Sequence, residues 1–241
     1  MIEIYKNLGE TPLQALNRLR LEQPELKNEK LSYAGRLDPM AEGVMLVLVG
    51  GENKNRNKYL NLSKEYEFEV LFSFSTDTYD LLGLVDKVSL PGIIENDKIV
   101  NELKTFLGKQ KEQYPPFSSK PVFGKPLFTW AREGKLEDIE IPSKEIEIFD
   151  IKLIDTKLIT SKELLDSIKN KISKIKGDFR QEDIIKRWTS VMNENPTAKF
   201  TLAKIKMHAS SGTYARNIAY KLGQKLGIPS LAYSIKRTAY K

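Results

Sequence analysis

The sequence has no cysteine and one histidine, His208. Disulfides, thiolate zinc sites and thiol nucleophiles are therefore excluded, and so in practice is a serine–histidine system. His208 falls among the lysines on the polar side of an expected strand, so we expect it to face solvent. Acid and base chemistry must come from carboxylate, tyrosine, lysine or arginine, and we expect no metal site.

Long apolar runs and nucleotide-binding glycine loops are also missing. No run approaches the ~20 apolar residues of a membrane span, and the N-terminus, MIEIYK, lacks the apolar core of a signal peptide. We expect a cytoplasmic protein with no membrane partner and no cofactor. Lysine and arginine number 39 against 32 acidic residues, a net charge of +7. This excess suits a polyanionic partner, although many other proteins share it.

Residues 35–51 place a carboxylate, Asp38, in a turn at the edge of the core. Pro39 fixes this turn, and glycines on both sides leave it open. The apolar run 44–49 that follows has the length and β-branched content of a buried strand. Asp38 is either an ordinary turn residue, as aspartate often is, or a functional carboxylate on a rigid support.

The remaining chain alternates between strand and helix patterns. We expect helices over 12–22, after a cap at Asn96 or Asp97, and in two segments of 161–192 broken at 177–178. A last helix is expected with Ile218, Leu222 and Leu226 on its apolar face, ended by Gly227 and Pro229. Strands are expected at 66–74, with Tyr66, Phe68, Val70, Phe72 and Phe74 on one face, at 146–154 and at 203–209. Residues 110–134 contain too many prolines for a central strand and are expected to form an exposed excursion.

Several motifs, in matching order, resemble those of the TruB family of pseudouridine synthases. They are 35–44 (GRLDPMAEGV), 64–66 (KEY), 76–83 (TDTYDLLG), 113–134, 209–216 (ASSGTYAR) and 234–238 (SIKRT). Two positions depart from the family: Tyr33 stands where a histidine is usual, and Glu42 where threonine is usual. Residues 155–200 fall outside the motifs, and we expect them to be a helical insertion.

The resemblance implies an α+β pseudouridine synthase fold. In that fold a mixed, mainly antiparallel sheet is flanked by helices and crossed by a central RNA-binding cleft. We expect residues 1–241 to form a single catalytic domain, without the PUA RNA-binding domain that many relatives append, and to act as a monomer.

The family's catalytic residues map onto Asp38, Tyr66 and Arg216. Asp38 would act as a nucleophile at the sugar or as a base at C2′, and the resemblance does not decide between the two. Arg216 would pair with Asp38, and Tyr66 would stack on the uracil and help to remove the C5 proton. Alternatively, Arg216 is a surface residue in the first turn of a helix, and Tyr66 is the first aromatic of a core strand.

We expect the substrate to contact further residues. They are Tyr33, Arg36, Lys64, Tyr214 and Ile235 around the pocket, and Lys120, Lys125 and Arg132 in the excursion. The basic and aromatic composition of the excursion suits RNA, though its aromatic side chains can equally pack on the domain.

The function implied is conversion of uridine to pseudouridine in structured RNA, with the T-arm U55 of tRNA as substrate and with base flipping. Two alternatives remain. One is an active synthase on a different RNA site, and the other is an RNA-binding chaperone with the same fold and no turnover.

Overall fold

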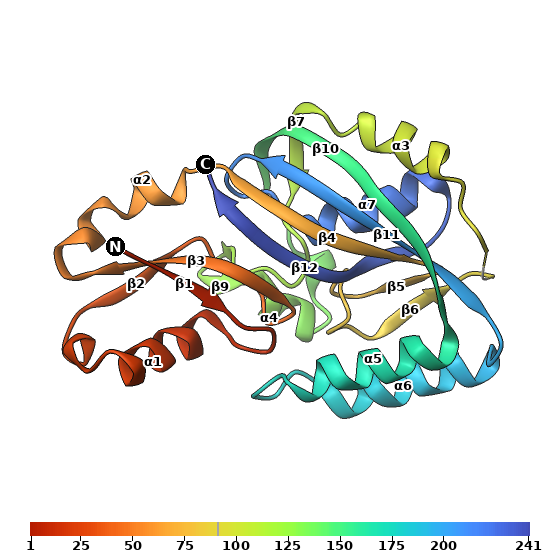
Figure 1. Cartoon of the computed structure of the whole chain (residues 1–241), viewed down its shortest axis with the longest axis horizontal. Coiled ribbons are helices and arrows are strands. Elements are labelled where there is room, and N and C mark those ends of the chain that lie inside the picture. Colours follow the sequence, from red (N-terminus) through yellow and green to blue (C-terminus); the bar gives the residue numbers. More distant parts are fainter. Residues whose placement is uncertain (91) are drawn as a thin grey trace.

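The computed structural model describes residues 1–90 and 92–241, and within them eight strands form one mixed sheet (Figure 1). The strands are β1 (Ile2–Lys6), β2 (Leu31–Ala34), β3 (Ala41–Val49), β4 (Lys64–Phe72), β7 (Gly108–Gln113), β10 (Ser143–Thr160), β11 (Lys199–Ala209) and β12 (Ser230–Tyr240). Their order is β1-β3-β12-β4-β11-β10-β7, with β2 beside β3. Only the β3–β12 pairing is parallel among the pairings of the described strands.

Two short hairpins and a set of helices surround this sheet. The hairpins are β5 (Phe74–Thr76) with β6 (Val85–Val88), and β8 (Pro121–Val122) with β9 (Lys125–Pro126). The α-helices are α1 (Pro12–Glu22), α2 (Arg56–Leu60), α3 (Asn96–Lys104), α4 (Leu127–Arg132), α5 (Ser161–Ser173), α6 (Gln181–Glu194) and α7 (Ala215–Leu226). The expected fold class, α+β with a mixed and mainly antiparallel sheet, is confirmed. Along the described chain, we find no helix with both the length and the apolarity to cross a membrane.

Three apolar clusters fix the helices on the sheet. α3 and α7 cover one face through residues such as Leu103 and Leu222, which belong to the same buried cluster as Phe68 of β4. α5 and α6 cover the other face with a cluster that includes the fully buried Trp188, and α1 packs on β1 and β3. In Figure 1 the α5–α6 pair lies below the sheet, and its connecting loop points toward the N-terminal strands and α1.

The alternation along β4 ends earlier than the sequence pattern predicts. Phe74 was expected on the same face as Phe72 but packs in the opposite cluster, edge to face with Trp188 and Phe200. Ser73 has φ +79°, outside the extended region, so the strand breaks there and the faces change over. The prediction for Phe74 was therefore wrong.

Several other expected elements match, and some need correction. The helix 12–22 is confirmed, with a capping box between Thr11 and Gln14. The cap predicted at Asn96 or Asp97 is wrong, because the capping position of α3 is Glu95 and makes no side-chain cap bond. Residues 110–113 lie in β7, which pairs with β10, so the expected excursion begins only at Tyr114. A strand tolerates these residues because the prolines all follow it.

The segment 155–200 and His208 also differ in detail from expectation. Both ends of 155–200 lie in strands β10 and β11, so its helical part is α5 and α6. His208 is half-buried instead of exposed, with Nε2 2.8 Å from the Ser63 hydroxyl and its ring against Phe149.

Candidate active site

Asp38 lies in the turn between β2 and β3, and this turn is fixed by backbone hydrogen bonds. The Ala41 amide donates to the Asp38 carbonyl at 3.0 Å, and the Gly9 amide, from the β1–α1 loop, donates to the Pro39 carbonyl at 3.0 Å. The Asp38 side chain is 26% exposed, so its carboxylate is accessible on a rigid support.

The structure requires a glycine at position 43, five residues after Asp38 in the motif. Gly43 lies opposite Arg237 where β3 and β12 run parallel, and its φ is +116°. A Cβ there would come within 2.1 Å of the Arg237 carbonyl oxygen. Only glycine allows this close approach, which anchors the Asp38 turn to the centre of the sheet.

Arg216, in the first turn of α7, is buried directly beside Asp38. Its Nε lies 3.0 Å from Asp38 Oδ2, a close ion pair without the alignment of a hydrogen bond. Nη1 donates to the Thr78 carbonyl at 2.8 Å and Nη2 to the Phe117 carbonyl at 3.1 Å. The surface alternative for Arg216 is thereby excluded, because its side chain is only 3% exposed.

Burial and neighbouring acids act in opposite directions on Arg216. Burial disfavours its charge, but the carboxylates of Asp38 and Asp80 outweigh this effect and raise the pKa of Arg216 above its ordinary value. Arg216 is therefore a permanent cation that faces the Asp38 carboxylate.

A cavity of about 260 Å³ opens above this ion pair. Seven of the eleven predicted site residues line it: Arg36, Asp38, Lys64, Tyr66, Tyr214, Arg216 and Ile235. They come from the Asp38 turn, β4, β12 and the start of α7. Residues separated by as many as 199 positions in the sequence are therefore gathered around one space.

Tyrosine and apolar side chains form the walls of this cavity. Tyr66 is 8% exposed, and burial raises the pKa of its phenol, so the group is neutral at pH 7. Burial, together with the charge of Asp38, also raises the pKa of Tyr214. The centre of the Tyr214 ring lies 5.6 Å from the Arg216 Cζ atom. Planar rings and the apolar Ile235 suit a flat, uncharged ligand.

Lys64 lines the same cavity, but its ammonium group is bound by backbone carbonyls. Its Nζ donates to the carbonyls of Leu60 and Leu62 at 2.7 and 2.6 Å. Burial, with a further contribution from Arg237, lowers the pKa of Lys64 to about 8. These bonds indicate that Lys64 holds the start of β4, and hence Tyr66, in place.

A second, larger cavity of about 500 Å³ adjoins the first. The two share Arg36, Leu37, Asp38, Ser119 and Arg216, so Asp38 is accessible from both. Arg132, from α4, lines the larger cavity. The Asp38–Arg216 ion pair therefore lies where the two cavities adjoin.

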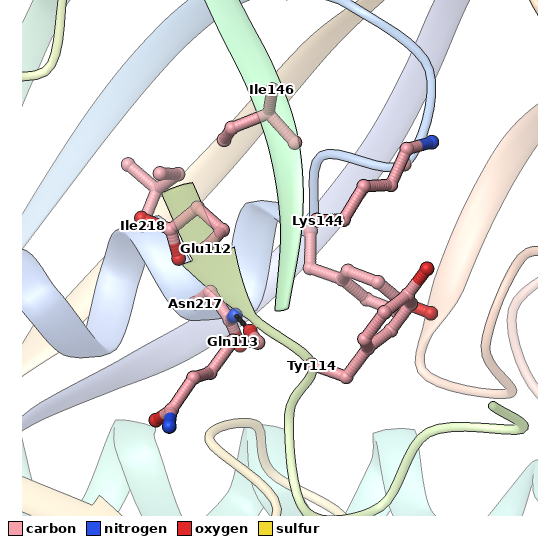
Figure 2. Close-up of a pocket in the computed structure, with 9 residues that line it drawn as sticks. Glu112, Gln113, Tyr114, Lys144, Ile146, Asn217 and Ile218 are labelled. Atoms are coloured by element: carbon pink, nitrogen blue, oxygen red, sulfur yellow. Dashed lines mark hydrogen bonds between the residues drawn. The ribbon is translucent and has the colours of Figure 1, made fainter. Parts of the chain in front are cut away.

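The segment that follows β7, residues 114–119, lines both cavities and is called the roof of the site. It is tied to α7. In Figure 2, Asn217 reaches the end of β7, where its Nδ2 donates to the Gln113 carbonyl at 2.9 Å. The next residue, Tyr114, packs edge to face on Tyr214 with ring centres 6.1 Å apart. The neighbouring Phe117 carbonyl accepts from Arg216. This segment and Arg216 therefore hold each other in position.

Three predicted substrate-binding residues lie outside both cavities. The Tyr33 ring packs against the α1 cluster, and its hydroxyl accepts from Arg36 at 3.2 Å. Lys120 lies over the Tyr114 ring at 5.4 Å, and Lys125 pairs with Glu133. Tyr33 is thus placed to orient Arg36, while the two lysines belong to the chain between β7 and α4.

Asp80 is a site residue that sequence reasoning did not single out. It is 5% exposed and lines the larger cavity, and its carboxylate accepts from the Thr78 hydroxyl at 2.8 Å and the Leu82 amide at 2.9 Å. Burial raises the pKa of Asp80 to about 6, although Arg216 acts in the opposite direction. Asp80 lies in the recognised motif 76–83, which contains two aspartates, Asp77 and Asp80. The presence of a second acid in this motif was the signal that could have found it.

Arg237 was also missed. It is 1% exposed, donates to the carbonyls of Val44 and Gly35 at 2.7 and 3.2 Å, and lines the smaller cavity beside Tyr66. Two buried arginines therefore flank the Asp38 turn. Within residues 1–90 and 92–241, acidic and histidine side chains form no cluster of three that could hold a metal.

These features define a class of protein: an α+β fold with a site for nucleophilic or acid–base chemistry, built from a carboxylate, a buried arginine and a tyrosine. A family model described as "TruB family pseudouridylate synthase (N terminal domain)" matches residues 23–179. The chain belongs to the TruB family.

Individual known proteins agree with this assignment. The tRNA pseudouridine synthase B of Bacillus pumilus is 30% identical over 236 residues, which are 98% of this chain and 63% of that protein. The protein of the same name from Lactococcus lactis is 28% identical, over 99% of this chain and 61% of its own length. The chain therefore spans somewhat less than two thirds of these relatives.

Solved structures share the fold. A chain in the crystal structure of a Cbf5–Nop10–Gar1 complex superposes with a TM-score of 0.59 at 15% identity, covering 99% of this chain and 48% of that one. At this level of identity the likeness supports the fold alone.

Proposed function

We propose that this chain isomerises uridine to pseudouridine in structured RNA, with the T-arm U55 of tRNA as its substrate. The observation that carries the proposal is the Asp38–Arg216 ion pair, which faces Tyr66 across a cavity of about 260 Å³. The family to which the chain belongs and the names of its relatives supply the reaction.

The reaction exchanges one bond to the sugar for another. The C1′–N1 bond breaks, the freed uracil turns, and C5 bonds to C1′, after which C5 loses its proton and N1 gains one. Asp38 either attacks C1′ or removes the C2′ proton, and both routes require an ionised carboxylate. Arg216 orients this carboxylate and, because it is permanently charged, stabilises its ionised form.

Tyr66 and Ile235 provide a flat, apolar place in which the freed uracil can turn. Because burial keeps the Tyr66 phenol protonated, we assign it a hydrogen-bonding role, relaying the C5 proton toward solvent, rather than that of a phenolate base. Stacking on an aromatic ring contributes about 1–3 kcal/mol per base, enough to retain the uracil while it is detached.

A uridine in a folded RNA reaches Asp38 only after it leaves its stack, so base flipping is part of the proposal. Arg36 and Arg132 line the larger cavity, through which the nucleotide would enter, and Lys120 and Lys125 belong to the chain between β7 and α4 that also contributes Phe117 and Ser119 to it. The net charge of +7 supports the same partner. We further propose a cytoplasmic monomer, with residues 1–241 as one catalytic domain and with helices α5 and α6 of the 155–200 segment as an insertion.

Mapping pseudouridine in RNA from cells with and without this protein tests the substrate. We expect one site, U55 in the T-arm, to disappear when the protein is removed and to return with the wild-type gene. Loss of pseudouridine at another RNA position would support a redirected synthase. Unchanged pseudouridine, with RNA binding retained in vitro, would support a chaperone without turnover.

A further inference from the structure

The connection between α5 and α6, residues 174–180, reaches the larger cavity at the active site. Lys176, Phe179 and Arg180 line this cavity together with Asp38 and Arg216. The connection belongs to the 155–200 segment, which lies outside the motifs that carry the family resemblance. Figure 1 shows it projecting from the helical pair toward the N-terminal part of the chain. A segment with no motif of its own is therefore a wall of the site.

Contacts with the catalytic turn fix the position of this connection. A Cβ on Gly9, whose φ is +93°, would lie 2.3 Å from the Lys174 carbonyl oxygen, so the two backbones touch. The Gly9 amide in turn donates to the Pro39 carbonyl, next to Asp38. The start of the connection thus packs on the loop that supports the Asp38 turn.

Arg180 ties the end of the connection to the roof of the site. Its guanidinium donates twice to the Asp77 carboxylate, at 2.8 and 3.3 Å, and lies 5.1 Å from the centre of the Phe117 ring. The Phe117 carbonyl accepts from Arg216. A bidentate pair and a stacked ring leave Arg180 little freedom, so the intervening residues are held against the cavity.

Lys176 differs from Arg180 because its charge is not engaged. It is exposed, and among the ion pairs of residues 1–90 and 92–241 none involves Lys176, Arg36 or Arg132. These three cations come from three separate segments and line one cavity. The carboxylate of Asp178 lies in the same lining, where one of its oxygens accepts from the Arg180 amide.

We propose that the α5–α6 connection is an RNA-contacting wall of the active site, in which Lys176 binds a backbone phosphate of a nucleotide next to the flipped uridine. The inference rests on the proposed function, since it takes RNA as the occupant of the cavity. A phosphate near the mouth would meet cations from three sides, which is the arrangement that positions a nucleic acid backbone. The segment therefore helps to select which RNA structure can enter.

The test compares two variants of the full chain, Lys176→Gln and Lys169→Gln. Both variants remove one positive charge from the segment that contains α5, α6 and their connection. Lys169, however, is an exposed residue of α5 that does not line the cavity. Affinity for a T-arm stem-loop RNA is measured by fluorescence anisotropy over a range of salt concentrations, and turnover is measured separately on the same RNA.

Loss of one phosphate contact lowers the slope of log affinity against log salt by about 0.7–0.9, which corresponds to roughly sixfold weaker binding at 0.1 M salt. We expect this change for Lys176→Gln, near wild-type behaviour for Lys169→Gln, and recovery with Lys176→Arg. Equal affinity and slope in Lys176→Gln and Lys169→Gln would overturn the inference while leaving the proposed function intact. If Lys176→Gln weakens binding as expected but the wild-type chain forms no pseudouridine, the proposed function alone is overturned.

Discussion

Replacing Arg216 with methionine removes a buried cation and leaves three partners without it. The Asp38 carboxylate loses its ion pair, and the Thr78 and Phe117 carbonyls lose their donors. Methionine fills most of the space that the arginine stem occupies, so the change tests the charge and the hydrogen bonds more than the packing.

The expected cost follows from these contacts. Breaking a buried ion pair costs about 3–5 kcal/mol, but Asp38 is 26% exposed and solvent recovers part of that loss. An orphaned buried carbonyl adds about 1 kcal/mol or more. We therefore expect a loss of about 3 kcal/mol in the free energy of unfolding, which lowers Tm by about 6–12 °C for a chain of this size.

Arg216→Lys is the matched control, because lysine keeps the charge but cannot form the three-way contact. We expect it to regain part of the stability and little of the activity, since the Phe117 segment loses its anchor. Urea unfolding gives the stability, and single-turnover tritium release from 5-tritiated uridine RNA gives the rate. A methionine variant within 1 kcal/mol of wild type and with turnover within tenfold would refute the role assigned to Arg216.

Three further predictions concern the surroundings of the site. Burial raises the pKa of Asp80 from 3.8 to about 6, so the folded state binds its proton more tightly and the contribution of Asp80 to stability falls as pH rises through 6. Urea unfolding should show wild type losing about 1 kcal/mol more than Asp80→Asn between pH 5 and 7.5; parallel pH profiles would contradict this. Gly43→Ala should cost about 3 kcal/mol or more by thermal unfolding, because the new methyl group meets the Arg237 carbonyl; the control Gly51→Ala has nothing within 4 Å and should cost under about 1 kcal/mol. Lys120→Gln should weaken RNA affinity more than Lys125→Gln, because only the latter cation already pairs with an acid, and equal losses in a binding titration would oppose this reading.

The sequence was sufficient for the carboxylate and the arginine at the centre of the site, but not for every motif residue, since Asp80 and Arg237 were missed. Asp38 and Arg216 were assigned from strings around them, and the structure brings them to 3.0 Å. The strand and helix patterns around them were also largely right, because apolar periodicity follows directly from which face is buried.

What could not be predicted depends on long-range packing. Lys176 and Arg180 reach the site only because the helical pair folds back onto the Gly9 loop, and no local pattern encodes that approach. The Tyr33 ring turns to the α1 cluster, although its alignment with the family's usual histidine had suggested the pocket. Phe74 changes faces because of one backbone angle at Ser73.

Tritium release by Asp38→Asn tests the central claim most directly. The exchange is nearly isosteric and removes only the charge needed by a nucleophile or base, so fold and RNA affinity should persist. With 5-tritiated uridine in a T-arm stem-loop, we expect wild type to release tritium as C5 bonds to the sugar and Asp38→Asn to release none above background. Turnover by the asparagine variant within tenfold of wild type would contradict the assignment of Asp38 as the catalytic carboxylate.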